Sequence, residues 1–258
     1  MSNRALVTGA SSGIGAAFAR LLAVRGTDLV IVAHGAEGLE RLASELTSRY
    51  RINVEVVPAD LTDAADLSRV EALLADPANE IDLLVNNAGF GMKKSFLAAE
   101  LAEEEAMFDV LCRAVLVLSH AAGRAMKARG QGQIINVSSV AGWIASGTYS
   151  AAKSWVTVFS EGLAGELAGS GVTVTALCPG FTRTEFHARA KIRDDAFPGF
   201  MWLDASRLVR ECLEDADKGR VISVPSVLYK GLHLATKIAP RRLLRSGGVV
   251  TRHRPPTR

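Results

Sequence analysis

The chain has 258 residues, of which 48% are apolar and 22% are charged, and its formal net charge is +3. This length and composition are typical of one globular domain with a sizeable core, so we expect a single domain over residues 1–258. Most of the excess positive charge lies in the last eighteen residues, and a nucleic-acid-binding surface is therefore not favoured.

The three cysteines, Cys112, Cys178 and Cys212, are far apart and lack the spacing of a metal site. Each falls in an apolar segment, so we expect reduced core residues and no metal site. The first strand pattern begins by Ala5, which leaves no room for a signal peptide, and no run reaches the roughly 18 apolar residues of a membrane span. These features favour a cytoplasmic protein.

A short apolar strand pattern over residues 5–8 leads into a glycine-rich turn and then a helical pattern over residues 16–25. Glycines in such a turn permit positive φ and let backbone amides approach a pyrophosphate, while the start of a helix favours an anion. The turn therefore predicts a nucleotide phosphate site, and the alternative is an ordinary strand-to-helix connection. The candidate residues are Gly9, Ser11, Ser12, Gly13, Ile14 and Gly15.

The second strand pattern, over residues 29–33, ends at His34, where dinucleotide-binding folds contact the adenosine ribose. An acidic residue there would bind the ribose hydroxyls of NAD and repel the 2′-phosphate of NADP. Neither Ala33 nor His34 is acidic, so the pattern favours NADP, with NAD as the other possibility. No arginine stands there either. His34 is a candidate phosphate donor when protonated, and the alternative is an exposed turn residue.

Helix and strand patterns then alternate along the chain, and each strand is short and almost continuously apolar. This alternation predicts an α/β fold with a doubly wound, mainly parallel sheet that is covered by helices on both faces. The expected helices span residues 37–50, 63–74, 100–129 and 149–168, and the expected strands span residues 53–57, 81–85, 133–137 and 172–177.

Polar clusters follow two of these strands, at the edge where ligands bind in such sheets. Asp60 and Leu61 follow the third strand, and Asp60 is a candidate acceptor for an adenine amino group. Asn87, Ala88 and Gly89 follow the fourth strand, where the asparagine can fix a turn by side-chain to backbone hydrogen bonds. The alternatives are a helix cap and an ordinary loop.

Tyr149 precedes Lys153 by four residues in a helical pattern, so the ammonium is expected one turn from the phenol on the same face. A nearby cation lowers the pKa of a phenol, and acid/base work near neutral pH needs a shift of about 2–3 units from ~10. By itself, the spacing is also that of an ordinary helix pair. Ser139 lies upstream, and Pro179 and Gly180 end the next strand.

These motifs, in this order at successive strand ends, together resemble the classical short-chain dehydrogenase/reductase family over roughly residues 4–185. The segments that carry the resemblance are TGASSGIG at residues 8–15, Asp60, NNAG at residues 86–89, Ser139, Tyr149 with Lys153, and Pro179-Gly180. The resemblance implies a Rossmann-type sheet of seven parallel strands, the last over residues 219–224. It also implies hydride exchange between a nicotinamide dinucleotide and a small-molecule carbonyl or alcohol, and a homo-oligomer.

The resemblance also assigns roles to residues. Gly9, Gly13 and Gly15 would hold the pyrophosphate, Asp60 the adenine, and Asn87 the turn beside the adenosine ribose. Thr182 or Thr184 would bond the carboxamide. Tyr149 would donate a proton to the carbonyl oxygen, Ser139 would hold that oxygen, and Lys153 would lower the phenol pKa and bind the nicotinamide ribose.

Two departures from the family pattern bear on turnover. Leu111 stands where the family often carries a catalytic asparagine in a segment like Asp-x-Asn-x-Arg. Ser139 lies only ten residues before Tyr149, a short connection that Gly142 and Gly147 could permit. The first departure keeps a second function open, a dinucleotide-binding scaffold or regulatory protein with little turnover.

The last part of the chain bears on substrate and partners. Residues 186–205 include a strongly aromatic run and predict a lid over a lipophilic substrate, such as a 3-oxoacyl chain or a steroid-like ketone; the alternative is packing on the core or a partner subunit. Residues 226–258 form a basic amphipathic extension. Packing on the subunit core or a partner is favoured there over contact with an anionic membrane surface.

Overall fold

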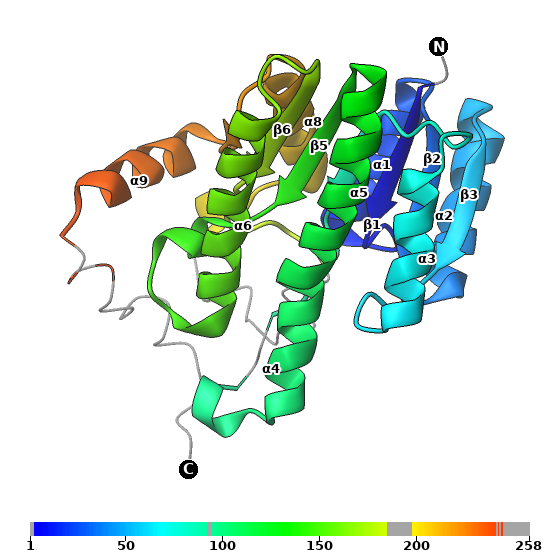
Figure 1. Ribbon diagram of the computed structural model, residues 1–258. Coiled ribbons are helices and arrows are strands. Elements are labelled where there is room, and N and C mark those ends of the chain that lie inside the picture. The colour runs from blue at the N-terminus through cyan, green and yellow to red at the C-terminus, as the bar shows by residue number, and fades with distance from the viewer. Residues whose placement is uncertain (1–2, 92–93, 185–197, 241, 243, 245–258) are drawn as a thin grey trace.

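The computed structural model describes residues 3–91, 94–184, 198–240, 242 and 244. Its centre is a parallel sheet of seven strands in the order β3-β2-β1-β4-β5-β6-β7 (Figure 1). The strand order reverses between β1 and β4, and the crevice at the carboxyl ends of those strands is where such sheets bind ligands. The predicted fold class is confirmed. The strands are β1 (Arg4–Thr8), β2 (Asp28–Ala33), β3 (Val54–Pro58), β4 (Leu83–Asn86), β5 (Gly132–Val137), β6 (Val172–Leu177) and β7 (Ile222–Ser223).

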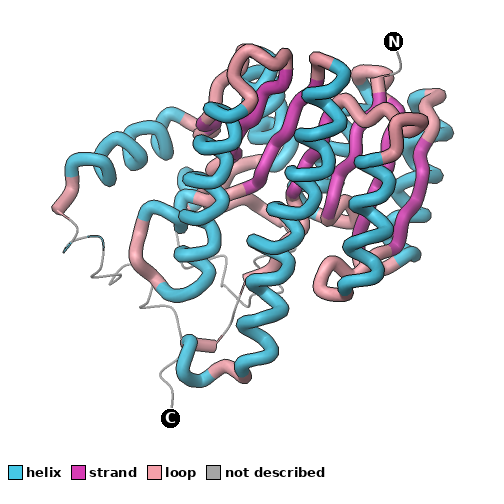
Figure 2. The backbone as a smooth tube through the Cα atoms, in the orientation of Figure 1, coloured by secondary structure: helices cyan, strands magenta, loops and turns pink. Residues whose placement is uncertain are grey.

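Helices cover both faces of the sheet (Figure 2). On one face, a buried cluster joins the strands to α1 (Gly13–Val24), α2 (Ala36–Tyr50) and α8 (Ala205–Asp217). On the other face, a second cluster joins them to α3 (Ala64–Ala75), α5 (Ala114–Arg129) and α6 (Gly147–Glu166). Strands buried on both faces need apolar side chains at consecutive positions, which explains why β2 reads as a continuous apolar run rather than an alternating one.

The helix that the sequence predicts over residues 100–129 is not a regular α-helix. α4 (Leu101–Phe108) passes into a π-helical turn, Asp109–Arg113, before α5 begins. A π-turn inserts an extra residue into the helix and re-aims the side chains around it. Leu111 lies inside this turn and is buried. The apolar periodicity of the sequence could not reveal the insertion, because the helix keeps its direction through it (Figure 1).

By length and composition alone, the continuous helical segment Leu101–Arg129 is apolar enough to cross a membrane. The sequence has no run of about 18 apolar residues, as expected, but this segment is apolar on average over a window of that length. In the structure, 61% of the apolar window is buried inside the fold, as in the core helix of a globular protein.

The C-terminal stretch predicted over residues 226–258 begins with α9 (Val227–Ile238), which lies beyond β7 at the edge of the sheet opposite β3 (Figure 1). Its outer side chains are exposed: 83% for Val227, 63% for Leu234 and 79% for Ile238. The inner side of α9 packs on the subunit core, since Tyr229 belongs to a buried cluster there, but these outer apolar side chains do not cover the core. Packing on a partner subunit and contact with a membrane stay predictions, and residues 241, 243 and 245–258 lie outside the described residues.

The lid predicted over residues 186–205 lies mostly outside the described residues. From this segment, the structure describes only residues 198–205, which include a short 3₁₀ turn, Gly199–Met201.

A buried polar network joins the two central strands to the helices that cover them. The Asn86 side-chain amide donates to Ser119 Oγ (3.0 Å) and to Asn136 Oδ1 (2.9 Å). Asn136 Nδ2 in turn donates to Ser160 Oγ (3.0 Å). All four side chains are buried, so each lost partner would leave a polar atom in a low-dielectric interior, which makes the network costly to break.

We expect Asn136→Ala to lower the free energy of unfolding by about 2–4 kcal/mol, because it removes the hydrogen bonds that satisfy buried groups on two helices and a strand. Chemical denaturation would measure the loss. Asn53→Ala is the matched control, since the side chain of this exposed asparagine donates to the partly exposed Asp28 carboxylate, and its loss should cost less than about 1 kcal/mol. Asn86→Ala combined with Asn136→Ala should cost less than the sum of the single changes, and strict additivity would contradict the network.

Candidate active site

The glycine-rich turn after β1 is packed so closely that side chains are excluded. Gly9 and Gly13 have φ of +65° and +58°. A Cβ on Gly9 would lie 2.8 Å from the Ala88 Cα atom, and one on Gly15 would lie 2.2 Å from the Gly9 carbonyl oxygen. Only glycine fits these positions, and the backbone of the turn therefore forms the wall of the site.

Asn87 holds this turn from the neighbouring strand. Its Nδ2 atom donates to the carbonyl oxygens of Thr8 (2.9 Å) and Gly9 (3.2 Å). The Thr8 hydroxyl accepts from the backbone N–H groups of Asn87 (2.9 Å) and Ala88 (3.0 Å). These bonds fix the loops after β1 and β4 relative to each other, as the sequence predicts for the asparagine.

One cavity of about 710 Å³ lies at the carboxyl ends of the strands, and the predicted site residues meet in it with one exception. Gly15 does not line the cavity, because it lies behind the turn against the Gly9 carbonyl. The predicted residues that line it are Gly9, Ser11, Ser12, Gly13, Ile14, His34, Asp60, Leu61, Asn87, Ala88, Gly89, Ser139, Tyr149, Lys153, Pro179, Gly180, Thr182 and Thr184.

Further lining residues were not predicted as site residues. Thr62 carried a signal in the sequence, since a threonine two residues after an aspartate is typical of a side-chain-stabilised turn. Ala33 and Leu111 occupy positions that the family pattern marks. The rest are small or apolar residues that become part of the site by tertiary placement. Together with Thr62, the further lining residues are Ala33, Ala59, Phe90, Gly91, Ala106, Val110, Leu111, Val137 and Ser138.

One side of the cavity is suited to bind a phosphate group. The N-terminus of α1 opens into it, and the first turn of that helix carries no acidic residue that would repel phosphate. A Cβ on Gly13 would lie 3.3 Å from Thr184 Cβ, so the phosphate turn directly faces the segment after β6. The Thr182 hydroxyl donates to the Gly180 carbonyl oxygen (3.0 Å), which makes that segment a compact turn.

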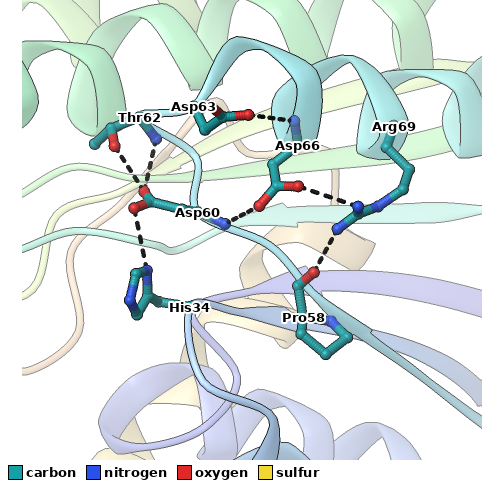
Figure 3. A network of polar contacts seen from close by, with 7 residues as sticks. All are labelled: His34, Pro58, Asp60, Thr62, Asp63, Asp66 and Arg69. Atoms are coloured by element: carbon teal, nitrogen blue, oxygen red, sulfur yellow. Dashed lines mark hydrogen bonds and ion pairs between the residues drawn. The ribbon is translucent and has the colours of Figure 1, made fainter.

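At one end of the cavity, Asp60 is fixed by several polar contacts (Figure 3). Its Oδ1 atom accepts from the N–H (2.9 Å) and the hydroxyl (2.8 Å) of Thr62, and its own N–H donates to Asp66 Oδ2 (2.8 Å). His34 Nδ1 lies 3.2 Å from Asp60 Oδ2. The hydrogen bonds from Thr62, followed by the nearby His34, lower the pKa of Asp60, so its carboxylate stays charged.

At the other end, the two neighbouring serines after β5 have different environments. Ser138 is buried, and its hydroxyl contacts the Lys153 carbonyl oxygen (2.6 Å) and the Thr157 hydroxyl (2.7 Å). Ser139 caps the 3₁₀ turn Val140–Trp143, where its Oγ accepts from the Ala141 N–H (3.1 Å), and it also hydrogen-bonds Tyr149. Ser139 is therefore the serine placed beside the phenol, as predicted.

The short connection from Ser139 to Tyr149 depends on two glycines, as the sequence suggested. A Cβ on Gly142 would lie 2.8 Å from the Ser154 N–H nitrogen of α6, so the 3₁₀ turn packs directly on the helix backbone. Gly147, with φ of +82°, begins α6. The connection thereby brings the serine and the tyrosine to the same side of the cavity.

Tyr149 and Lys153 lie on one face of α6, with the ammonium 5.9 Å from the centre of the phenol ring. The predicted lowering of the phenol pKa was wrong for this arrangement. Burial raises the pKa of Tyr149 to about 12, and the hydrogen bond with Ser139 offsets only part of that rise. The Lys153 Nζ atom donates instead to the Val137 carbonyl oxygen (2.7 Å), and burial lowers the pKa of this lysine to about 8.

Leu111 packs over the loop after β4 next to this lysine. A Cβ on Gly89 would lie 2.7 Å from Leu111 Cδ2 and 4.0 Å from Lys153 Nζ. The π-turn therefore places the apolar side chain of Leu111 beside Lys153, at the position where the family pattern often has the side-chain amide of an asparagine. Leu111 offers no hydrogen bond there.

We expect Lys153→Met to raise the free energy of unfolding at pH 7 by about 1–3 kcal/mol. Because burial lowers the pKa of Lys153, the charged lysine disfavours folding by about 1.36 kcal/mol for each pKa unit of the shift. The substitution removes this cost, but it leaves the Val137 carbonyl oxygen without a hydrogen bond, which lowers the gain in stability by about 1 kcal/mol. The cost of the charge is fully present below pH 8 and disappears as the pH rises to the unfolded value of 10.5. Thermal unfolding should therefore show a smaller stability difference between Lys153→Met and the parent at pH 10 than at pH 7.

Lys127→Met on α5 is the control for that experiment, because this lysine is exposed and the substitution should change stability little at either pH. An advantage of Lys153→Met that is equal at pH 7 and pH 10 would show that packing rather than charge is responsible.

Comparison with known proteins extends these observations. A family model described as short chain dehydrogenase matches residues 3–195. Galactitol 2-dehydrogenase (L-tagatose-forming) from Cereibacter sphaeroides is 34% identical over 232 residues, which are 87% of this chain and 89% of that protein.

Solved structures are similar over nearly the whole chain. A short-chain dehydrogenase from Sphingobium yanoikuyae in complex with NADPH has a TM-score of 0.84 and 34% identity, with 91% of this chain and 93% of that chain covered. The bulky-bulky ketone specific alcohol dehydrogenase from Comamonas testosteroni has a TM-score of 0.80 and 31% identity, with 91% and 92% covered. The chain belongs to the short-chain dehydrogenase/reductase family and is an oxidoreductase that acts on alcohol or carbonyl groups with a nicotinamide cofactor.

Proposed function

We propose that this enzyme is an NADP-preferring reductase of bulky lipophilic carbonyl compounds, acting reversibly on the corresponding alcohols. The observation that carries the proposal is that Ser139, Tyr149 and Lys153 line the same cavity as the glycine turn. A substrate beside the phenol would therefore lie within the cavity that also accommodates the dinucleotide.

In the direction of reduction, the phenolic proton of Tyr149 passes to the carbonyl oxygen of the substrate. The Ser139 hydroxyl holds that oxygen while its negative charge develops. NADPH supplies the hydride to the carbonyl carbon when it is bound. The Lys153 ammonium stabilises the phenolate that remains, until a proton from solvent restores the phenol.

Burial raises the pKa of Tyr149 to about 12, so the phenol holds its proton at neutral pH but is a weaker acid than a free phenol. Proton donation to the substrate therefore depends on stabilising the phenolate as it forms. The Lys153 ammonium, 5.9 Å from the centre of the ring, is the cation placed to do this.

The cofactor would extend along the cavity from His34 to Lys153. Gly9 and Gly13 would hold the pyrophosphate, Asp60 the adenine, and Thr182 or Thr184 the carboxamide. Lys153 would also bind the nicotinamide ribose. The Sphingobium relative supports NADP as the preferred cofactor, since its structure is described as a complex with NADPH. NAD remains the second possibility.

The substrate class rests on the apolar part of the cavity wall. Phe90, Val110 and Leu111 line the cavity together with Tyr149. The side chains of Phe90, Val110 and Leu111 offer no hydrogen bonds, and a polyol like the substrate named for the Cereibacter relative would lose hydration beside them without compensation. The Comamonas structure, named for bulky-bulky ketones, supports the lipophilic alternative.

Leu111 supports a second candidate, a dinucleotide-binding protein with little turnover. If proton resupply to Lys153 normally requires an amide at this place, its replacement by a buried leucine slows the cycle. Replacing Leu111 with Asn would then raise the rate.

The purified enzyme should oxidise NADPH in the presence of a bulky aryl ketone, and Tyr149→Phe should lower kcat by about 100-fold or more, since general acid catalysis typically contributes 10² to 10⁴. The variant should bind NADPH as the parent does, because only one hydroxyl is lost. Tyr50→Phe on α2, outside the cavity, is the matched control. Undiminished turnover of Tyr149→Phe would overturn the mechanism, and cofactor binding without turnover in the parent would favour the scaffold.

Calorimetric titration would test the cofactor preference. We expect NADPH to bind more tightly than NADH, and His34→Ala to weaken NADPH binding about fivefold while NADH changes less than twofold, because His34 is 82% exposed at the cavity end beside Asp60 and can reach a 2′-phosphate. His120→Ala on α5, another exposed histidine, should alter neither affinity. Tighter binding of NADH by the parent would reverse the assignment.

A further inference from the structure

Tyr229 lies on the inner side of α9 and is 1% exposed. It belongs to a small buried cluster with Cys178 and Val224, against which Phe181 and Leu203 pack. The cluster lies directly behind the segment after β6, whose residues line the cavity. Tyr229 itself does not line the cavity.

The ring of Tyr229 supports Gly180. A Cβ on this glycine would lie 2.0 Å from the Tyr229 Cζ atom and 2.1 Å from its Cε2 atom, so the glycine backbone rests against the ring face. The requirement for glycine at this position therefore comes from the ring behind the loop. Moving the ring would move the loop.

The hydroxyl of Tyr229 joins two segments. It accepts a hydrogen bond from the Phe181 N–H (3.1 Å) and donates one to the Met201 carbonyl oxygen (2.8 Å). Burial raises the pKa of this phenol, so it keeps the proton that it donates. One side chain thus satisfies a donor on the cavity-lining segment and an acceptor on the segment that precedes α8.

The same two segments are also joined by their backbones. Leu203 N–H donates to the Phe181 carbonyl oxygen (2.7 Å), and Arg183 N–H donates to the Leu203 carbonyl oxygen (3.0 Å). Thr182 and Leu203 form a parallel bridge between these bonds. Residues 181–183 and 201–203 consequently form one unit, and Tyr229 connects this unit to α9.

We propose that Tyr229 is a positioning residue, which holds residues 179–184 in the place where they bind the nicotinamide end of the cofactor. The inference rests on the proposed orientation of the dinucleotide in the cavity. It makes α9 part of the cofactor site without any contact between α9 and the cofactor. Because the phosphate turn and Asp60 lie on other elements, the adenosine end should not depend on Tyr229.

The test is Tyr229→Phe, which keeps the ring against Gly180 and removes both hydrogen bonds. We expect its affinity for NADPH to fall about fivefold to twentyfold, as is typical for the loss of one or two hydrogen bonds. Its affinity for 2′,5′-ADP, which represents the adenosine end alone, should stay within twofold of the parent. Calorimetry measures both ligands, and circular dichroism confirms that the variant is folded.

The outcomes separate this inference from the proposed function. A parent protein that binds neither ligand would overturn the proposed cofactor site itself. A parent that binds both, with a variant whose NADPH affinity is unchanged, would overturn only the role of Tyr229. Equal losses for NADPH and 2′,5′-ADP would also overturn it, because they would indicate a general structural effect.

Hydrogen exchange in the parent is a second, independent measurement. The Phe181 amide should be protected, and its protection should fall in Tyr229→Phe while that of the Asn87 amide, which donates to Thr8, is retained. Free exchange of the Phe181 amide in the parent would contradict the contact on which the inference stands.

Discussion

The hydrogen bond from the buried Lys153 ammonium to the Val137 carbonyl oxygen is the interaction on which the candidate active site depends. It connects α6 to the end of β5, and the Ser138 hydroxyl strengthens the connection by contacting the Lys153 carbonyl oxygen. Ser139 begins the next turn, so the serine, the tyrosine and the lysine all take their positions from this contact. The buried ammonium of Lys153 disfavours folding. The fold nevertheless keeps it at this place, because the chemistry of the site needs a cation beside the phenol.

The phosphate-binding part of the cavity, at the glycine-rich turn after β1, is held in place by close contacts between backbone segments rather than by a buried charge. The turn after β1 contacts the loop after β4 so tightly that glycine is required, and Asn87 holds the two together. Parallel strands place both loops at the same edge of the sheet, because their carboxyl ends all point the same way. A rigid phosphate turn and a buried lysine are thereby held at a fixed separation by the sheet between them.

Much of the fold was predictable because parallel strands buried on both faces must be continuously apolar, and the turns between them must carry glycine or small polar residues. The cavity-lining positions of Gly13, Asp60 and Ser139 followed from their places just after strands, and that of Tyr149 followed from its helical spacing to Lys153 and the family resemblance. The predictions failed where packing altered a local pattern. The π-turn around Leu111, the high phenol pKa of Tyr149 and the exposed outer side of α9 all depend on what surrounds the residues and not on their spacing.

The sequence by itself determined the order of strands and helices, the edge at which polar residues gather and the identity of the reactive side chains, because these depend on periodicity and on chemistry carried by single residues. Only the tertiary structure decided how far each group is buried and which partner it meets. It directed the Lys153 ammonium to a carbonyl oxygen, set Leu111 beside that lysine, and brought Tyr229 from the C-terminal helix to the back of Gly180. Desolvation and close contact arise between segments that are distant along the chain, so no local pattern could reveal them.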